Sequence, residues 1–231
     1  LGDLTQLYNT HPDLQSLVRQ LAASIEEEIQ SLEVHQQFPG YSKFGFRLIE
    51  WIERHSSGED LPPSWYFASA PVSYPMICAT QLLYVLAAVY TWNLPYDEVL
   101  SLFKGASGHS QGVVAAIAFA SAETAGELVR RTVHTVRFMF YVGLRMQQVS
   151  DVPPTISKQR TDLLRESREN GNGDPTTLLA LFRLPRKVIE KYMHLVNATL
   201  KDDPSRQIEI ALVNGRRAFV LAGHPETLHT L

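Results

Sequence analysis

A serine enclosed by glycines is the residue of this chain best suited to covalent chemistry. The stretch Gly108-His109-Ser110-Gln111-Gly112 fits the pattern G-x-S-x-G, with Ser110 at its centre. In that pattern the serine stands on a sharp turn before a helix, and the glycines leave room for the turn. Ser110 is therefore a candidate nucleophile. The backbone amide of Gln111 is a candidate donor to the oxyanion that forms after attack on a carbonyl group.

The same pattern is compatible with more than one class of protein. Esterases and thioesterases use it for hydrolysis, acyltransferases use it for group transfer, and five-residue patterns also arise in loops without any catalytic role. The pattern alone does not separate these possibilities.

The segments beside the serine predict how it is held. Residues 113–120 are apolar and rich in small side chains, which suits a helix buried against a sheet. Pro95 is expected to start a short amphipathic helix over 96–103, and Leu102-Phe103-Lys104 is a candidate strand leading into the turn. A strand, a tight turn and a buried helix would together form a nucleophile elbow.

Further helices are expected in the first 150 residues. Apolar residues recur three and four positions apart, as in Leu14, Leu17, Val18 and Leu21. This spacing predicts helices over 12–33, 44–54, 76–91 and 121–149. The stretch 70–75 holds two prolines, which argues against a central strand there.

The pattern changes after residue 150. Residues 151–177 are rich in charge, proline and glycine and are expected to form an exposed loop. Residues 178–231 predict a strand over 178–184, a helix over 185–200, a hairpin of 208–213 and 218–221 around Asn214-Gly215, and a helix from 225. That order is typical of a ferredoxin-like α+β subdomain that lacks its last strand. The expected organisation is an α/β core (1–150), a loop (151–177) and an incomplete subdomain (178–231).

Composition excludes several classes of function. The chain of 231 residues carries a net charge of −3, which offers no field to attract nucleic acid or an anionic membrane. The longest apolar run, 76–90, is interrupted by Thr80 and Gln81 and is shorter than a membrane span needs. The single cysteine, Cys78, permits no internal disulfide and fits a reducing, cytoplasmic compartment. The histidines show no metal-ligand spacing, so no metal site is expected.

Three blocks of the sequence resemble the acyl-carrier-protein transacylase family, and the resemblance runs over nearly the whole chain. They are Ala70-Pro71-Val72-Ser73-Tyr74-Pro75 with Gln81, Lys104 to Gly112, and Ile208 to Gly223. Within that family the chain looks like the acetyltransferase domain at the start of the beta subunit of fungal type I fatty acid synthase. Fungal starter-unit transacylases are related but usually carry a cysteine where this chain has Ser110. The resemblance implies an α/β core with a parallel sheet and an inserted ferredoxin-like subdomain.

The resemblance also implies a reaction. Ser110 would attack a coenzyme A thioester to form an acyl-enzyme, and the phosphopantetheine thiol of an acyl carrier domain would then take the acyl group. No permanently bound cofactor is implied, and the partners would be the carrier domain and the alpha and beta subunits of a synthase. The family's second oxyanion amide, in a Gly-Gln-Gly motif, and its general-base histidine would fall before Leu1 and after Leu231, so the chain resembles a domain cut at both ends.

Four further residues are candidates for binding the substrate. In malonyl-loading relatives an arginine pairs the free carboxylate, and Val142 aligns with it here, which favours a neutral acyl group such as acetyl. Arg137 and Arg145 are its charged neighbours. Gln81 would line the acyl pocket, steady the turn or make a structural hydrogen bond. His109 would shape the pocket.

The fourth candidate is Asn214. Asparagine before glycine favours a type I′ hairpin turn, which accounts for this residue. In the family this loop lies near the active site, so the resemblance also implies a role in substrate binding. The sequence is also compatible with two other functional interpretations. One is an α/β-hydrolase-type esterase or thioesterase, and the other is an inactive structural fragment of a synthase.

Overall fold

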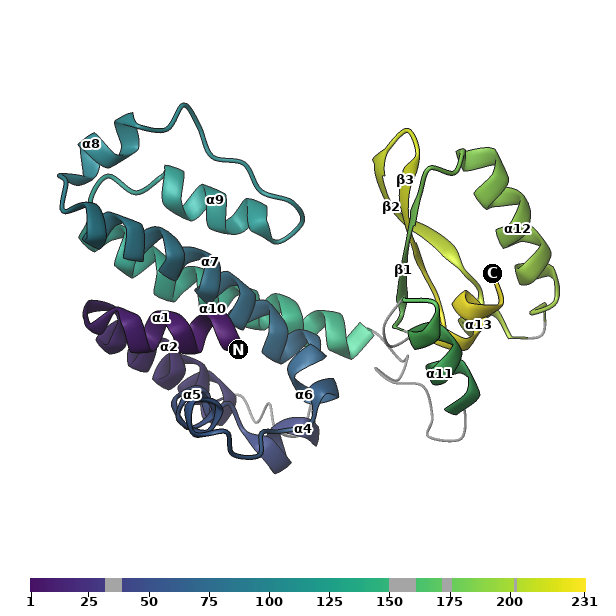
Figure 1. Ribbon diagram of the computed structural model, residues 1–231, viewed down its shortest axis with the longest axis horizontal. Helices are drawn as coiled ribbons and strands as arrows, with labels where there is room; N and C mark the ends of the chain where they lie inside the picture. The colour runs from purple at the N-terminus through teal and green to yellow at the C-terminus, as the bar shows by residue number, and fades with distance from the viewer. Residues whose placement is uncertain (32–38, 150–160, 172–175, 202) are drawn as a thin grey trace. The chain divides into compact units, whose positions relative to one another are not determined.

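The computed structural model describes residues 1–31, 39–149, 161–171, 176–201 and 203–231. It divides into two compact units, Leu1–Ser150 and Asp151–Leu231. Within the described residues the first unit contains only helices, and the second combines a three-stranded sheet with helices (Figure 1).

The helices of the first unit follow one another along the chain with short connections. They are α1 (Gly2–Thr10), α2 (Pro12–Ser31), α4 (Pro39–Phe44), α5 (Leu48–Ser57), α6 (Ser64–Ala68), α7 (Ala70–Trp92), α8 (Tyr96–Ser101), α9 (Gly112–Ala120) and α10 (Ala125–Val149). The helices expected over 12–33, 76–91, 96–103 and 121–149 are therefore present with shifted ends. Residues 32 and 33 lie outside the described part. The helix expected over 44–54 is displaced to α5, and α1 and α4 are additional.

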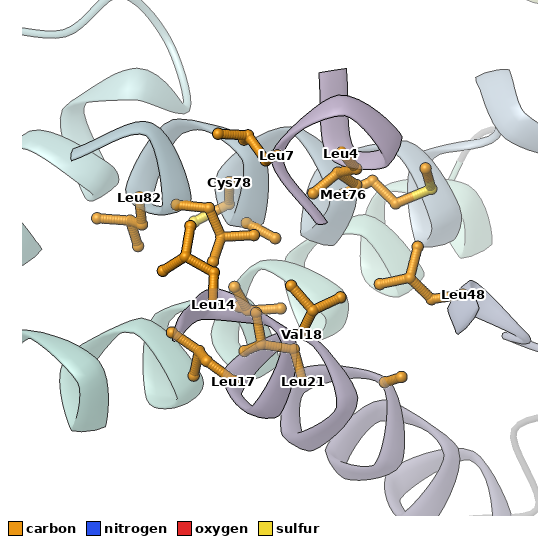
Figure 2. Close-up of a cluster of buried hydrophobic side chains, with 14 of the residues drawn as sticks. Leu4, Leu7, Leu14, Leu17, Val18, Leu21, Leu48, Met76, Cys78 and Leu82 are labelled. Atoms are coloured by element: carbon orange, nitrogen blue, oxygen red, sulfur yellow. The ribbon is translucent and has the colours of Figure 1, made fainter. Parts of the chain in front are cut away.

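Apolar side chains from all the helices of this unit form its core. Leu14, Val18 and Leu21 of α2 are completely or almost completely buried, as their spacing predicts. Figure 2 shows them together with Leu4 and Leu7 of α1, Leu48 of α5, and Met76, Cys78 and Leu82 of α7. Each helix therefore contributes one apolar stripe to a shared interior.

Helix α7 begins earlier than the sequence predicts because its proline-rich start is helical. Pro75 lies inside the helix and has no N–H group to donate to the carbonyl of Pro71. The hydroxyl of Tyr41 donates to that carbonyl oxygen instead, at 2.9 Å. A buried tyrosine thus supplies the hydrogen bond that proline removes, and the helix continues through the position.

The length of α7 corrects one expectation from the sequence. Its 23 residues are long and apolar enough to cross a membrane by length and composition alone, although no apolar run of that length was expected. In its most apolar stretch, 56% of the residues are buried inside the unit. Helix α7 packs against α10, α9, α1, α2 and α6, which is the environment of a core helix.

Helices α7 and α10 approach closely at a glycine. A Cβ atom added to Gly143 of α10 would lie 2.3 Å from the carbonyl oxygen of Ala70. Closer to the start of α10, Arg137 and Tyr141 both bind the carboxylate of Glu28 on α2. Close backbone contact on one side and a charged anchor on the other fix the position of α10 along its axis.

The strand expected at Leu102-Phe103-Lys104 is wrong. These residues form a turn and a bend after α8, and 105–108 have no regular structure. A parallel strand requires a hydrogen-bonded neighbour, and none of the described residues of the first unit is in a strand. The parallel sheet expected for this unit is accordingly absent from its described part.

The second unit is built around an antiparallel sheet. Its elements are α11 (Thr161–Glu169), β1 (Leu178–Phe182), α12 (Arg186–Ala198), a 3-10 helix (Pro204–Arg206), β2 (Glu209–Gly215), β3 (Ala218–Ala222) and α13 (Pro225–Thr230). The strand order is β1-β3-β2, with both pairs antiparallel. Ile189 of α12, Phe219 and Leu221 of β3, and Leu228 of α13 bury one face of the sheet.

Two expectations for the second unit need correction. Residues 161–169 form α11 rather than loop, because Leu163 is buried and gives the charged segment an apolar side to pack. Residues 151–160 and 172–175 of the expected loop lie outside the described part.

The hairpin turn is the other correction. It lies at Arg216-Arg217 and not at Asn214-Gly215, since Gly215 pairs with Ala218. An irregularity in the β2–β3 pairing between Val213 and Gly215 moves the turn two residues along the chain.

Candidate active site

Ser110 lies on a strained turn directly before α9. Its φ angle is 53°, in the left-handed region that residues with a side chain rarely adopt. The turn is closed by two backbone hydrogen bonds, from the amide of Gly112 to the carbonyl of His109 at 2.9 Å and from Val113 to Ser110 at 3.1 Å. Ser110 is exposed. The strained, accessible serine and the helix after it correspond to the turn and helix of a nucleophile elbow, whereas the strand that precedes the serine in such an elbow is absent here.

Gly108 is required by the closeness of this turn. A Cβ atom at position 108 would lie 2.1 Å from both the carbonyl carbon and the carbonyl oxygen of Gly112. No side chain can be accommodated at that distance. A Cβ atom added to Gly105, three residues earlier, would meet no atom within 4 Å. The two glycines therefore differ in function, and only Gly108 is needed for the chain to fold back on itself.

The amide of Gln111 is available at the start of α9. Gln111 is the residue that precedes the first helical position, Gly112. Among the described residues, no backbone acceptor for its N–H group is present. The first amides of a helix lack partners within the helix, and together they favour a negative charge at that end. The Gln111 amide therefore follows Ser110 directly in the chain, at the positive end of α9.

Two glutamine side chains near the turn carry buried oxygen atoms. The Oε1 atoms of Gln81 and Gln111 are both inaccessible and have no hydrogen-bond partner in the described part of the chain. The Nε2 atom of Gln81 lies 3.7 Å from the position that a Cβ on Gly112 would occupy. Gln81 of α7 is thus packed beneath the turn, at contact distance from the helix that follows Ser110.

An apolar pocket of about 450 Å³ lies beside the turn. It is lined by Gln81, Leu82, Val85, Phe103, Gly105, Ala106, Ser107, Gly108, His109, Gly112, Ala115, Ala116 and Phe119. Ser110 is not among these residues. The structure therefore brings two predicted site residues, Gln81 and His109, to one pocket, with Ser110 on the adjoining exposed turn.

Of the other two predicted binding residues, Val142 does not line this pocket and Asn214 belongs to the second unit. Val142 is half-buried on α10, and no residue of α10 lines the pocket. Asn214 is exposed on β2 of the second unit. Arg145 is exposed and donates to the side chain of Gln148 at 2.9 Å.

Arg137 is engaged elsewhere, in a network that sequence reasoning missed. Its guanidinium pairs with the carboxylate of Glu28, whose side chain is only 9% exposed, and Tyr141 donates to the same carboxylate. The sequence offers little signal for this, because Glu28 belongs to a run of three glutamates that reads as solvated charge. The pocket residues Phe103 and Phe119 were also missed as site residues, although Phe119 belongs to the apolar helix expected there.

His109 is the one histidine among the described residues that line the pocket. His224 accepts a hydrogen bond from the amide of Glu226 at 3.3 Å, and His229 lies 3.1 Å from the carboxylate of Glu166. Burial raises the pKa of the Cys78 thiol to about 12, so this cysteine is protonated near neutral pH. It is therefore a poor alternative nucleophile.

Comparison with known proteins agrees with the resemblance. The beta subunit of fatty acid synthase from Saccharomyces cerevisiae is 29% identical over 235 residues, covering 100% of this chain and 11% of that protein. The beta subunit from Schizosaccharomyces pombe is 28% identical and covers 99% of this chain. The fatty acid synthase beta subunit aflB of Emericella nidulans is also 28% identical over 99% of this chain.

These relatives are much longer than the present sequence. The chain spans 11%, 10% and 10% of the three proteins, respectively. The family described as "Starter unit:ACP transacylase in aflatoxin biosynthesis" (SAT) matches residues 1–231. The chain therefore belongs to the starter unit:ACP transacylase family, and its relatives are beta subunits of fungal fatty acid synthases.

Proposed function

We propose that this chain transfers a neutral short acyl group from coenzyme A to an acyl carrier domain by way of an acyl-Ser110 intermediate. The observation that carries the proposal is the strained, exposed position of Ser110 at the start of α9, with φ of 53°. Such strain is retained where the surrounding structure holds a side chain ready for chemistry.

The reaction proceeds in two balanced steps. In the first, the Ser110 hydroxyl loses its proton to a base and its oxygen attacks the thioester carbonyl. The carbon–sulfur bond then breaks, and the coenzyme A thiolate leaves as it takes up that proton. In the second step the phosphopantetheine thiol of the carrier gives its proton to the base and its sulfur attacks the ester carbonyl. The ester carbon–oxygen bond then breaks, and the Ser110 oxygen takes up that proton. Splitting the transfer in this way replaces one difficult step by two easier ones.

The Gln111 amide stabilises the tetrahedral oxyanion of both steps. Among the described residues its N–H group has no backbone acceptor, which supports this role. Removing one such donor typically lowers transition-state stabilisation by about 3–4 kcal/mol. Gln81 and His109 hold the turn and shape the adjoining pocket.

The residues of α10 favour a neutral acyl group over one that carries a free carboxylate. Val142 cannot pair a carboxylate, and an unpaired carboxylate is costly to bury. The engagement of Arg137 by Glu28 supports the same choice, since that guanidinium is not free to bind a malonyl carboxylate. An acetyl group meets these limits.

We propose the following domain organisation for a chain with this function. We assign residues 1–150 to the acyltransferase-like part that carries Ser110, 151–177 to a connecting segment and 178–231 to a ferredoxin-like subdomain. The strand order β1-β3-β2 supports the last assignment. The partners are the acyl carrier domain and the other parts of a cytoplasmic type I fatty acid synthase. No permanently bound cofactor is required.

The fate of a labelled acetyl group distinguishes transfer to the carrier from hydrolysis to free acetate. The full-length protein is supplied with labelled acetyl-coenzyme A and a phosphopantetheinylated carrier protein. Transfer predicts that label accumulates on the carrier and that Ser110→Ala abolishes this accumulation. Label recovered mainly as free acetate, in the presence of excess carrier, would identify a thioesterase instead.

A further inference from the structure

The side chain of Gln81 opposes the stability of the helix bundle that contains it. Its Oε1 atom is inaccessible and has no hydrogen-bond partner among the described residues. An unpaired acceptor in the interior costs folding free energy, whereas an apolar side chain of the same shape does not. Buried polar groups are nearly always paired, so an exception in the wall of a pocket calls for an explanation.

The surroundings of Gln81 on α7 make the exception clearer. Cys78 and Leu82, on the same helix, are completely buried. The hydroxyl of Thr80, one residue earlier, donates within the helix to the carbonyl of Met76 at 2.8 Å. The polar group next to Gln81 is therefore satisfied by the fold, and the Gln81 oxygen is not. Local choices that oppose stability are characteristic of functional positions.

Gln81 contributes a polar group to the pocket beside the serine turn. The pocket has a volume of about 450 Å³, and its walls include the apolar side chains of Leu82, Val85 and Phe119. The Nε2 atom of Gln81 lies 3.7 Å from the position that a Cβ on Gly112 would occupy, two residues after the candidate nucleophile. The carboxamide therefore lies in an apolar wall close to the reacting serine.

The chemistry of the substrates indicates which group pairs with this carboxamide. A saturated hydrocarbon acyl group carries no hydrogen-bond donor, and in the proposed function its carbonyl accepts from the Gln111 amide. The pantetheine arm that bears the thioester holds two amide groups, each with one N–H and one C=O, separated by methylene groups. The nearer amide is joined to the sulfur by a short ethylene link. The arm thus combines apolar segments with the polar groups that Gln81 lacks as partners.

We infer that the carboxamide of Gln81 hydrogen-bonds an amide of the pantetheine arm, which is common to coenzyme A and the carrier domain. The inference rests on the proposed function, because it takes pantetheine thioesters as the substrates. A primary carboxamide offers donors and an acceptor, and a secondary amide offers the complementary groups. The last torsion of glutamine has broad preferences, so the side chain can present either atom to the pocket. The apolar walls strengthen a hydrogen bond formed there.

The experiment removes the amide from the acyl donor. Acylation of Ser110 in the full-length protein is measured with S-acetyl-N-acetylcysteamine, which contains the nearer amide, and with S-pentyl thioacetate, in which methylene groups replace that amide. Gln81→Met keeps the length of the side chain without its polar atoms. Thr80→Val is the matched control, because Thr80 donates within its own helix and does not line the pocket.

The unmodified protein should prefer the donor that contains the amide. Its kcat/KM for that donor should be about tenfold higher than for the alkyl donor, because a site that hydrogen-bonds its ligand rejects the analogue without that group. Gln81→Met should abolish the preference, and Thr80→Val should keep it. The melting temperature of Gln81→Met should be unchanged or higher, since the variant removes an unpaired buried oxygen. A role of Gln81 in folding predicts a lower melting temperature.

The second half of the reaction separates the two sources of the arm. Protein acetylated on Ser110 is treated with N-acetylcysteamine or with pentane-1-thiol, and loss of the acetyl group is followed by intact-mass measurement. A preference for the amide during acylation assigns the contact to coenzyme A. A preference during removal of the acetyl group assigns it to the carrier. Either preference supports the inference if Gln81→Met abolishes it.

Equal use of both donors and of both acceptor thiols by the unmodified protein overturns the inference, as does an amide preference that survives Gln81→Met. Calorimetric binding of pantetheine to Ser110→Ala protein reads the contact without catalysis. Its Kd should rise about tenfold when Gln81→Met is added, and an unchanged Kd would overturn the inference. That rise, together with no acylation of Ser110 in the unmodified protein, would count against the proposed function and not against the contact.

Discussion

The hydroxyl of Tyr41 donates a hydrogen bond to the carbonyl of Pro71, at 2.9 Å, where Pro75 has no N–H group to give. Tyr41 is buried, so its replacement by phenylalanine leaves that carbonyl without a partner in the interior. Tyr41→Phe should lower the free energy of unfolding by about 1–3 kcal/mol, the cost of an unsatisfied buried polar group. Urea unfolding of the full-length protein measures the change.

Tyr192→Phe is the control for this variant, because Tyr192 is 52% exposed. It should leave the unfolding midpoint of the second unit unchanged. An equally stable Tyr41→Phe protein would mean that water, or a local change in α7, satisfies Pro71 without the tyrosine.

The glycines around Ser110 provide a matched pair for testing the turn. Gly108→Ala places a methyl group 2.1 Å from the backbone of Gly112, so the turn must open and Ser110 must move. Displacement of a nucleophile by about 1 Å can reduce the rate of its reaction on the order of 100-fold. The acylation rate of Gly108→Ala should fall by at least that factor, as followed by rapid-quench mass spectrometry.

Gly105→Ala should retain the acylation rate of the unmodified protein, since nothing lies within 4 Å of its added methyl group. Equal acylation rates for Gly108→Ala and Gly105→Ala would show that the backbone of Gly112 does not exclude a side chain at position 108.

The contributions of Arg137 and Glu28 to the free energy of unfolding should depend on each other. Glu28 is 9% and Arg137 40% exposed at the side chain. Arg137→Leu leaves a nearly buried carboxylate and should cost about 2 kcal/mol of stability, less than the 3–5 kcal/mol of fully buried pairs, because solvent reaches the arginine. The double variant Glu28→Leu/Arg137→Leu should recover part of that loss. A double-mutant cycle with additive effects would show that the two groups are not coupled.

Burial of Cys78 makes a prediction about reactivity and pH. Its pKa of about 12 lies above the value near 8.5 of a free thiol. The folded protein should therefore resist iodoacetamide at pH 8, whereas the unfolded protein reacts readily. Because the folded-state pKa is raised, the contribution of this thiol to stability is intact below about pH 8.5 and is lost as the pH rises toward 12. Rapid alkylation of native protein at pH 8 would contradict the burial.

Some features of the site could be predicted from the sequence because local rules determine them. The glycines at 108 and 112 and the small apolar residues after them are sufficient to place a turn and a helix around Ser110. The periodic leucines of α2 likewise identify its buried side. In both places the local preference and the packed structure agree.

Other features depend on partners that are distant in the sequence. Pro75 lies inside a helix because Tyr41, 34 residues earlier, replaces the missing hydrogen bond. Glu28 is buried because Arg137, more than 100 residues later, neutralises it. The hairpin turn falls on Arg216-Arg217 because the β2–β3 pairing is irregular near Asn214. No propensity of the individual residues encodes these three outcomes.

The central claim is that Ser110 carries the acyl group between two thiols. It is tested most directly by incubating full-length protein with acetyl-coenzyme A, quenching in acid and mapping the acetylated peptide by mass spectrometry. The account predicts one acetyl group, on Ser110, that disappears when carrier protein is added before the quench. An acetyl group on a different residue, or active transfer to the carrier by Ser110→Ala protein, would contradict it.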